Sequence, residues 1–476
     1  MNASTVAFDA DRHNWFTRVS RDLNPVHVDA LTARRTQAGA PIVHGMHSLL
    51  RLLEVAVENG VIRLGVTRLK AQFRKPIYVG EEVTVERTKE GSGGIRVRMM
   101  ANGLEVLLAS IGYGPETAAV SLLHALTVPE TIVPSSAREL ELEQIVAQSG
   151  RISFASTLEQ VETMFPVATR LLTAQRVAAL MCCSCLVGMV VPGLHSLFSA
   201  VDLCLTNDVS GSAHELCFEV SSVEPRFRLA RIAVLGGGLH GALETVSRLP
   251  PVRQAPVEHL TSMVKKNEFC RANALIIGGS RGLGELTAKM LAAGGARVTV
   301  TYAAAQRDAE LVAQEIRAAG FQCEAAAYDV RKSAAGQLGR LNLPVLNQLY
   351  YFATPPIFAR KAPLFDPRRF AEFNAFYVMG FFDLIEACIR LNPRGFTVFC
   401  PSSTAIQSRP LDMTEYAMSK AAVEILCDDI PHYFPSIELL TARLPRLPTD
   451  QTTSVLQVES ADPVGTLLPL IRKMQR

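Results

Sequence analysis

The hydrophobic pattern of residues 1–114 predicts one buried helix followed by antiparallel strands. Apolar residues recur at helical spacing from Ala40 to Ala56, which is typical of a helix with one buried face. Strand-like segments follow, separated by polar or glycine-rich turns, at residues 69–73, 82–88, 95–100 and 104–113. One long helix with an antiparallel meander indicates the α+β class.

Residues 115–255 repeat this pattern weakly. Pro115 to Ala137 is rich in Ala, Val, Thr and Pro and predicts a crossover linker with a short helix. A helix at 140–147 and a long apolar stretch at 164–189 precede four strand patterns, at 199–205, 214–220, 227–235 and 241–248. Residues 189–198 share Val, Gly, an apolar residue, His, Ser and Leu, in that order, with residues 41–50. We therefore predict a duplicated unit that pairs with the exposed sheet edge of the first.

A proline-rich linker, Arg248 to Pro256, separates these segments from a third one at residues 268–476. A buried strand pattern at 272–277 runs into a glycine-rich turn, and a helix then extends to about Gly294. The next strand pattern spans residues 297–302. This strand–turn–helix–strand order predicts a parallel sheet of the doubly wound α/β type.

The composition limits the binding partners and the cellular compartment that we expect for this protein. The 476 residues predict two to three domains, and 48% apolar with 20% charged residues indicates a well-packed protein. A net charge of +3 offers no basic stripe for a phosphate backbone, so we expect no nucleic acid. The first residues lack a signal-peptide pattern, and no run approaches about 18 apolar residues, so we expect a cytoplasmic protein without membrane contact.

The ten cysteines are scattered and do not form a disulfide framework. Cys182 and Cys185 make one C-x-x-C pair, with neither a second pair nor a histidine at ligand spacing. We interpret them as small buried helix residues and predict no metal site.

Candidate chemistry begins at Asp22 and His27, a carboxylate and an imidazole five residues apart on either side of Asn24-Pro25. Pro25 would break a helix through this stretch, so we predict a short irregular loop that carries both groups. Gly45 precedes the apolar helix pattern. This set suits moving a proton and a water on a carbonyl compound. The alternative is that Asp22 caps a turn and His27 is structural, as we expect for His44 and His47.

The motif Ser-x-Asp-x-Asn-Pro-x-His, followed by Ile-Val-His-Gly-Met, resembles MaoC-type hotdog (R)-specific enoyl-thioester hydratases and dehydratases. The resemblance implies that Asp22 and His27 are the catalytic pair and that the Gly45 amide binds the thioester oxyanion. Arg21 stands where the family usually has glycine, and we expect it to narrow the approach to the site.

The resemblance also implies that the duplicated unit is a second hotdog. The second unit lacks the motif, so we predict that it is catalytically silent and lines the acyl pocket. The alternative is a second active site built on His195 or Glu219.

A second set of residues lies in the third segment. The glycines have the spacing Gly-x-x-x-Gly-x-Gly, Asp329-Val330 ends a later strand, and Tyr416-x-x-x-Lys420 lies thirteen residues after Ser403. Together these residues resemble the short-chain dehydrogenase/reductase family. The resemblance implies that Tyr416 is the general acid, with Lys420, Ser403 and Asn374 in support. It implies that these residues bind the cofactor: Gly278, Ser280, Arg281, Gly282, Leu283, Gly284, Asp329, Val330, Tyr416 and Lys420.

We expect NADPH rather than NADH. The second strand ends at Tyr302-Ala303, without the carboxylate that would select NADH, and Arg281 and Arg307 could meet a 2′-phosphate. Two features depart from the family: Tyr351 to Thr354 replaces its Asn-Asn-Ala-Gly, and only 56 residues follow Lys420.

We therefore predict an α+β double hotdog, at residues 1–114 and 115–255, followed by an α/β Rossmann domain at 268–476. The predicted function is bifunctional: NADPH-dependent reduction of a 3-ketoacyl thioester, then dehydration of the (R)-3-hydroxyacyl thioester. We expect an acyl-CoA or acyl carrier protein thioester as substrate and at least a homodimer. The alternatives are the reverse, β-oxidation direction and a non-catalytic scaffold that binds acyl carriers.

Overall fold

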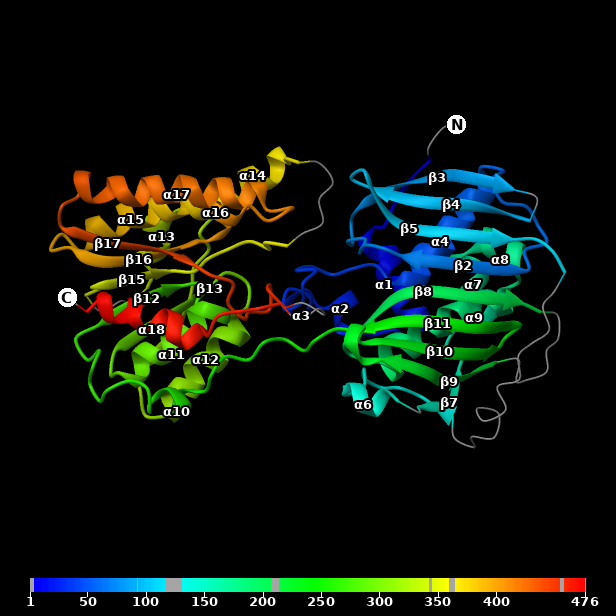
Figure 1. The fold of residues 1–476 in the computed structure, drawn as a ribbon, viewed down its shortest axis with the longest axis horizontal. Coiled ribbons are helices and arrows are strands. Elements are labelled where there is room, and N and C mark those ends of the chain that lie inside the picture. The colour runs from blue at the N-terminus through cyan, green and yellow to red at the C-terminus, as the bar shows by residue number, and fades with distance from the viewer. Residues whose placement is uncertain are drawn as a thin grey trace. The chain divides into compact units, whose positions relative to one another are not determined.

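The computed structural model describes residues 4–91, 93–115, 131–146, 148–206, 214–341, 345–358, 364–453 and 458–475. These residues form two compact units, the first ending at Pro250 and the second beginning at Pro251 (Figure 1). Most of the predicted linker between Pro115 and Ala137 lies outside the described residues.

The first unit is built on one sheet with the strand order β1-β3-β4-β5-β2-β8-β11-β10-β9-β7-β6 (Figure 1). The eleven strands are β1 (Ser4–Ala7), β2 (Arg68–Phe73), β3 (Glu82–Gly91), β4 (Gly94–Ala101), β5 (Leu104–Gly112), β6 (Thr131–Ile132), β7 (Ser149–Ser153), β8 (Ser196–Leu205), β9 (Glu215–Glu224), β10 (Leu229–Gly236) and β11 (Leu239–Ser247). The predicted strands are confirmed, with ends that differ by a few residues.

The sheet consists of two halves with the same strand order, joined at the β2–β8 pair. Reading outward from this seam, the first half runs β2, β5, β4, β3 and β1, and the second runs β8, β11, β10, β9 and β7. The seam is antiparallel, with Ala71 opposite Val201, and the Asp202 carboxylate accepts hydrogen bonds from Arg68 across it. The predicted duplication is therefore visible as a repeated strand order.

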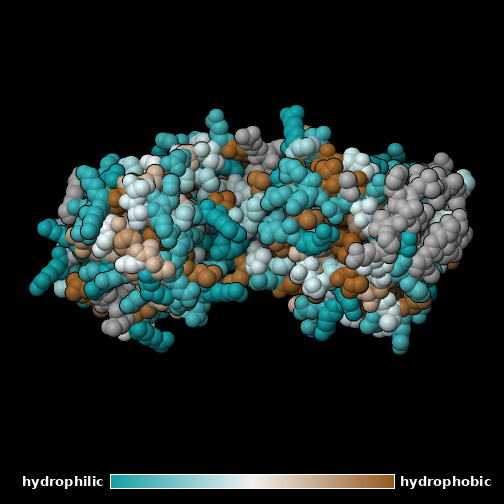
Figure 2. Space-filling model, turned by 90° about the horizontal axis from the view of Figure 1, so that it is seen from below, coloured by the Kyte–Doolittle hydropathy of each residue, from teal (hydrophilic) through white to brown (hydrophobic). Residues whose placement is uncertain are grey.

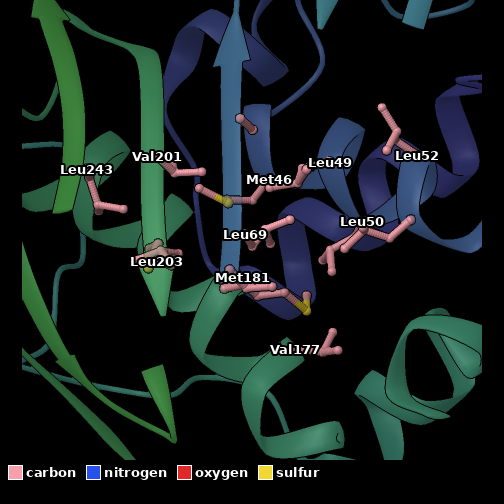
Figure 3. Packing of buried hydrophobic residues seen from close by; sticks show 14 of the residues in the cluster. Met46, Leu49, Leu50, Leu52, Leu69, Val177, Met181, Val201, Leu203 and Leu243 are labelled. Carbon is pink, nitrogen blue, oxygen red and sulfur yellow. The ribbon is translucent and has the colours of Figure 1, made fainter. Parts of the chain in front are cut away.

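Each half contributes a long buried helix to one shared core. The helices are α1 (Ala10–Ser20), α2 (Pro25–Val28), α3 (Ala30–Ala33), α4 (Gly45–Glu58), α6 (Leu142–Ile145), α7 (Leu158–Met164), α8 (Pro166–Leu172) and α9 (Ala174–Cys185), which continues as the π-helical segment η1 (Leu186–Val190). Met46 of α4 and Met181 of α9 lie in one hydrophobic cluster with Leu69 and Val201 of the seam strands (Figure 3).

The helix predicted from Ala40 begins instead at Gly45. Residues just before it are extended, because Ile42 pairs with Tyr78 and the Val43 amide donates to the Ile77 carbonyl at 2.8 Å. Tertiary pairing thus overrides the apolar helical pattern at its start.

No single helix among the described residues is long and apolar enough to cross a membrane, and the one pair that passes together, Pro166–Leu172 with Ala174–Val190, is bent by 109°. The face drawn in Figure 2 shows hydrophobic residues scattered in small groups among hydrophilic ones.

The second unit is a six-stranded parallel sheet with the order β14-β13-β12-β15-β16-β17 (Figure 1). Its strands are β12 (Asn273–Ile277), β13 (Arg297–Tyr302), β14 (Cys323–Ala327), β15 (Gln348–Tyr351), β16 (Phe396–Ser403) and β17 (Ile437–Leu444). Its helices are α10 (Val257–Leu260), α11 (Gly282–Ala293), α12 (Gln306–Ala318), α13 (Ala334–Leu338), α14 (Pro367–Asn374), the π-helical η3 (Ala375–Met379), α15 (Gly380–Leu391), α16 (Ala405–Ser408), α17 (Thr414–Tyr433) and α18 (Pro463–Lys473). In chain order the strands read 3-2-1-4-5-6, which is the Rossmann arrangement.

The sheet of the second unit separates two hydrophobic cores. Successive residues of β12 alternate between them: Ile276 packs with α11 on one face, and Leu275 and Ile277 pack with α15 on the other. Helices therefore cover both faces, and the carboxyl ends of the strands carry the candidate cofactor residues.

Candidate active sites

Asp22 follows directly on the end of α1. Arg21 caps that helix in the left-handed conformation, with φ 56° and ψ 23°, and its side chain is exposed. Glycine adopts this conformation without strain. The arginine that replaces the family's glycine therefore affects the strain of the backbone at this position. The sequence predicts that Arg21 narrows the approach to the site, whereas the structure places its side chain at the surface.

His27 lies on the short helix α2, so the prediction of one irregular loop carrying both groups is wrong for the histidine. Asn24 caps this helix, its side chain accepting from the Val26 amide at 3.1 Å, and Pro25 occupies the first helical position. Proline is tolerated there because that amide would have no intrahelical partner. The His27 Nδ1 donates to the Ile42 carbonyl at 2.7 Å. The lone pair of a neutral His27 is therefore on Nε2.

The structure brings Asp22 and His27 together. Their ligand atoms, together with one of His44, all lie within 4.8 Å of one another. Burial raises the pKa of Asp22, and the nearby His27 charge opposes that rise. Burial likewise lowers the pKa of His27, and Asp22 opposes that shift. One group thus holds a proton more readily than usual and the other stays neutral, as general acid and general base chemistry requires.

The second half of the sheet completes this site. Ser184 of α9 donates its hydroxyl to Asp22 Oδ2 at 2.7 Å. The Asn24 side-chain amide donates to the carbonyls of Gly188, Gly193 and Leu194 at 2.8, 3.1 and 3.3 Å. A Cβ at Gly188 would lie 2.1 Å from Asp22 Oδ1, so only glycine leaves room for the carboxylate.

The motif gave no indication of these partners. The available signal was the small residues Cys182 to Cys185 and Gly188, which let another backbone approach the helix. Cys182 and Cys185 are buried within it, as predicted.

Two further histidines, His44 and His13, lie beside the pair and support its backbone. His44 Nε2 donates to the Asp22 carbonyl at 3.0 Å, and His13 Nε2 donates to the His27 carbonyl at 2.9 Å. The rings of His27 and His44 stack with centroids 3.8 Å apart. Among the described side chains, Asp22, His27 and His44 are the one group of three that could hold a metal ion. Since Nδ1 of His27 and Nε2 of His44 already bond carbonyl oxygens, the arrangement suits proton transfer better.

Gly45 is the first residue of α4, so its amide is one of those without an intrahelical acceptor. A Cβ there would lie 3.3 Å from atoms of Phe73 and Phe198, one ring from each seam strand. The positive end of the α4 dipole therefore faces a confined space next to His44.

In the second unit the glycine-rich loop has the form of a pyrophosphate cradle. Gly278 and Gly282 have φ of 79° and 59°. A Cβ at Gly278 would lie 2.9 Å from the Ala353 amide nitrogen, and one at Gly284 would lie 2.3 Å from the Gly278 carbonyl. Since α11 begins at Gly282, its free amides follow directly on the loop, with Ser280 and Leu283 beside them. These residues fit a dinucleotide phosphate.

Tyr416 and Ser403 meet at the carboxyl end of β16. Burial raises the pKa of Tyr416, and the hydrogen bond with Ser403 opposes that rise. Lys420, one turn along α17, donates to the Pro401 carbonyl at 2.8 Å and lies 6.0 Å from the Tyr416 ring. Burial therefore outweighs the effect of Ser403 on the pKa of Tyr416.

Asn374 ends α14, and Phe373 of this helix and Tyr377 of η3 pack against the tyrosine. The rings of Phe373 and Tyr377 lie 5.8 and 5.9 Å from that of Tyr416, and the Lys420 ammonium sits 4.0 Å above the Tyr377 ring. The sequence motif did not single out Tyr377, whose ring packs against both the tyrosine and the lysine of the motif.

The remaining cofactor candidates lie at the ends of neighbouring strands. Asp329 and Val330 follow β14, and the Asp329 carboxylate is held by Arg331 at 2.8 and 2.9 Å. Tyr302 ends β13 without a carboxylate beside it, and Arg307 is exposed. Arg281 Nη1 lies 3.3 Å from Asp450 Oδ2. This ion pair competes with the binding of a phosphate by Arg281.

Two family models match the chain. Residues 2–108 match the model described as MaoC like domain, and residues 272–434 match the model described as short chain dehydrogenase. The chain therefore combines an N-terminal MaoC-like hydratase domain of hotdog type with a C-terminal short-chain dehydrogenase domain, as the motifs predicted.

Curated relatives match parts of the chain. The (R)-specific enoyl-CoA hydratase of Aeromonas caviae is 40% identical over 75 residues, which cover 15% of this chain and 54% of that protein. The mouse (Mus musculus) peroxisomal multifunctional enzyme type 2 is 30% identical over 138 residues, 28% of this chain and 17% of that enzyme. The chain thus spans between about a sixth and about a half of the length of these relatives.

Among solved structures, a short-chain dehydrogenase from Burkholderia cenocepacia J2315 in complex with NADP is 23% identical, with 43% of this chain and 91% of that chain covered and a TM-score of 0.39.

Proposed function

We propose that the chain is a bifunctional enzyme that reduces a 3-ketoacyl thioester and dehydrates the resulting (R)-3-hydroxyacyl thioester. The observation that supports it most strongly is the buried Asp22–His27 pair in the MaoC-like domain, together with Tyr416 and Ser403 in the dehydrogenase domain of the same chain. A reductase makes the hydroxyl group that a dehydratase removes. The two reactions are therefore consecutive steps on one substrate.

In the hydration direction, one water lies between His27 and Asp22. His27 Nε2 takes a proton from the water as its oxygen bonds to C3 and the C2–C3 π bond breaks. Asp22 then delivers a proton to C2, and the proton held by His27 passes back to the Asp22 carboxylate, whose oxygen lies within 4.8 Å of the imidazole nitrogen. Dehydration runs through the same steps in reverse. The raised pKa of Asp22 and the lowered pKa of His27 match these two roles.

The thioester carbonyl gathers negative charge while C2 exchanges its proton. We place it at the Gly45 amide, where the N-terminus of α4 stabilises an oxyanion. We propose that the second half of the sheet is a silent second hotdog, which would make the first unit a double hotdog. The repeated strand order supports this assignment, and so do the contacts that Ser184 and Gly188 make with Asp22.

In the second unit, Tyr416 protonates the carbonyl oxygen and Ser403 holds it, while Lys420 would hold the ribose of the cofactor. NADPH would supply the hydride to C3 and would be held by the loop from Gly278 to Gly284. The missing carboxylate after Tyr302 favours NADPH over NADH.

We propose acyl-CoA or acyl carrier protein thioesters as substrates, synthesis as the direction, and a homodimer as the smallest assembly. The similarity to an (R)-specific enoyl-CoA hydratase supports the thioester class.

Single-site variants separate the two activities. The wild-type protein is assayed with crotonyl-CoA for loss of enoyl absorbance, and with acetoacetyl-CoA and NADPH for NADPH consumption. We expect Asp22→Asn to abolish the first reaction alone and Tyr416→Phe the second alone. Absence of turnover of both thioesters by the wild type would favour a binding protein and refute the proposal.

A further inference from the structure

A half-buried arginine, with no acidic partner among the described residues, lies beside the candidate hydratase site. Arg248 follows β11 directly, and burial lowers its pKa to about 10. Its Nη2 donates to the Leu194 carbonyl at 3.0 Å, while its Nε is buried without a hydrogen-bond partner. Among the described residues, no carboxylate oxygen lies within the 4.0 Å of an ion pair with this guanidinium.

The position of Arg248 connects it to the catalytic motif. The Leu194 carbonyl that accepts from Arg248 also accepts from the Asn24 side chain at 3.3 Å. Asn24 lies between Asp22 and His27, and the charge of Arg248 is close enough to lower the pKa of His27. The second half of the sheet therefore places a cation at the side of the pair where His27 lies.

The bond to Leu194 uses one of the five donors of the guanidinium, and no described residue accepts from the other four. Partial burial of a charged group is costly unless something accepts from its donors. A structural role accounts for Nη2 and leaves the donors of Nη1, which is not fully buried as Nε is, without an acceptor among the described residues. A bound anion would accept from Nη1, because a guanidinium forms its strongest hydrogen bonds with a carboxylate or phosphate.

The proposed reaction limits which oxygen atoms of the substrate can accept hydrogen bonds from Arg248. The thioester carbonyl belongs at Gly45 and the 3-hydroxyl between Asp22 and His27. The phosphates of the carrier are separated from the thioester by the whole pantetheine arm, whereas Arg248 is near His27. What remains is a group on the acyl chain a few bonds beyond C3.

We infer that Arg248 binds a carboxylate on the acyl chain, so that the hydratase site prefers thioesters of dicarboxylic acids. The inference rests on the proposed function for the site's location. It assigns the second half a role in substrate selection in addition to supporting the fold.

Binding of unreactive thioesters tests this without turnover. Glutaryl-CoA carries a terminal carboxylate, and 5-methylhexanoyl-CoA replaces it with an uncharged group of the same shape. Calorimetric titration compares their Kd values for wild type, Arg248→Met, Arg248→Lys and the control Arg226→Met, which changes an exposed arginine of the same half.

We expect wild type and the Arg226 control to bind glutaryl-CoA at least about 10-fold more tightly than the isostere. Arg248→Met should abolish that preference, and Arg248→Lys should retain part of it. An equal preference in wild type and Arg248→Met, or none in wild type, would overturn the inference. Crotonyl-CoA hydration, measured on the same samples, reports separately on the proposed function.

Discussion

Replacing Gly188 with alanine tests whether the second half of the sheet shapes the active site of the first. The new Cβ would lie 2.1 Å from Asp22 Oδ1 and 2.7 Å from its Cγ, whereas real Cβ contacts essentially never fall below 3.0 Å. The carboxylate cannot simply rotate away, because Ser184 holds Oδ2 at 2.7 Å and the Asn24 amide lies 3.3 Å from Oδ1.

The carboxylate or η1 must therefore move by about 1 Å, a displacement that costs a positioned catalytic group about 100-fold in rate. We expect kcat/KM for crotonyl-CoA hydration to fall by about that factor, equivalent to about 2.7 kcal/mol. NADPH oxidation with acetoacetyl-CoA, measured on the same protein, should stay at the wild-type value.

Gly91→Ala is the matched control, since a Cβ at Gly91 meets nothing within 4 Å. The reasoning would be refuted if Gly188→Ala hydrated crotonyl-CoA at the wild-type rate. It would then also be more stable than wild type by about 1 kcal/mol, as alanine in place of glycine in an unstrained helix should be.

Three further variants probe the same unit. Ser184→Ala removes a hydrogen bond that lowers the pKa of Asp22, so the alkaline limb of the hydration pH profile, where Asp22 loses the proton that it delivers to C2, should move to higher pH; an unmoved limb would argue against Asp22 as the titrating group. His47→Phe replaces a buried ring whose two nitrogens have no partner and should raise the free energy of unfolding by about 1–2 kcal/mol. The gain should be larger at pH 5 than at pH 8, because the folded-state pKa of His47 is lowered and wild type loses stability as the pH falls below the unfolded value; an equal gain in urea titrations at both pH values would contradict this. Arg21→Gly relieves a left-handed residue and should raise the thermal midpoint, by about 0.5–1 kcal/mol of stability, whereas a lower midpoint would show that the arginine is not strained.

Local pattern predicted most of the strands because alternation and turn residues act over a few positions. The repeated order of the two halves was also predictable in outline, since residues 41–50 and 189–198 share a spacing. The start of α4 was not, because the pairing of Ile42 with Tyr78 depends on a contact that the sequence does not show.

The same limit applied to the sites. Asp22, His27, Tyr416 and Lys420 lie within compact motifs, and their identities could be predicted from spacing. Ser184 could not be predicted, because it reaches Asp22 across 162 residues and stands in an apolar helix where a serine usually means only a small side chain. The geometry of the hydratase site could therefore not be predicted from the motif, because it depends on packing between the two halves of the sheet.

Product analysis of the coupled reaction tests the central claim most directly. Acetoacetyl-CoA and NADPH are incubated with the full chain, and the thioesters are separated over time by chromatography and mass spectrometry. We predict transient (R)-3-hydroxybutyryl-CoA followed by crotonyl-CoA with wild type, accumulation of the hydroxy intermediate with Asp22→Asn, and no conversion with Tyr416→Phe. Crotonyl-CoA from Asp22→Asn at the wild-type rate, or a hydroxy product of S configuration, would contradict the account.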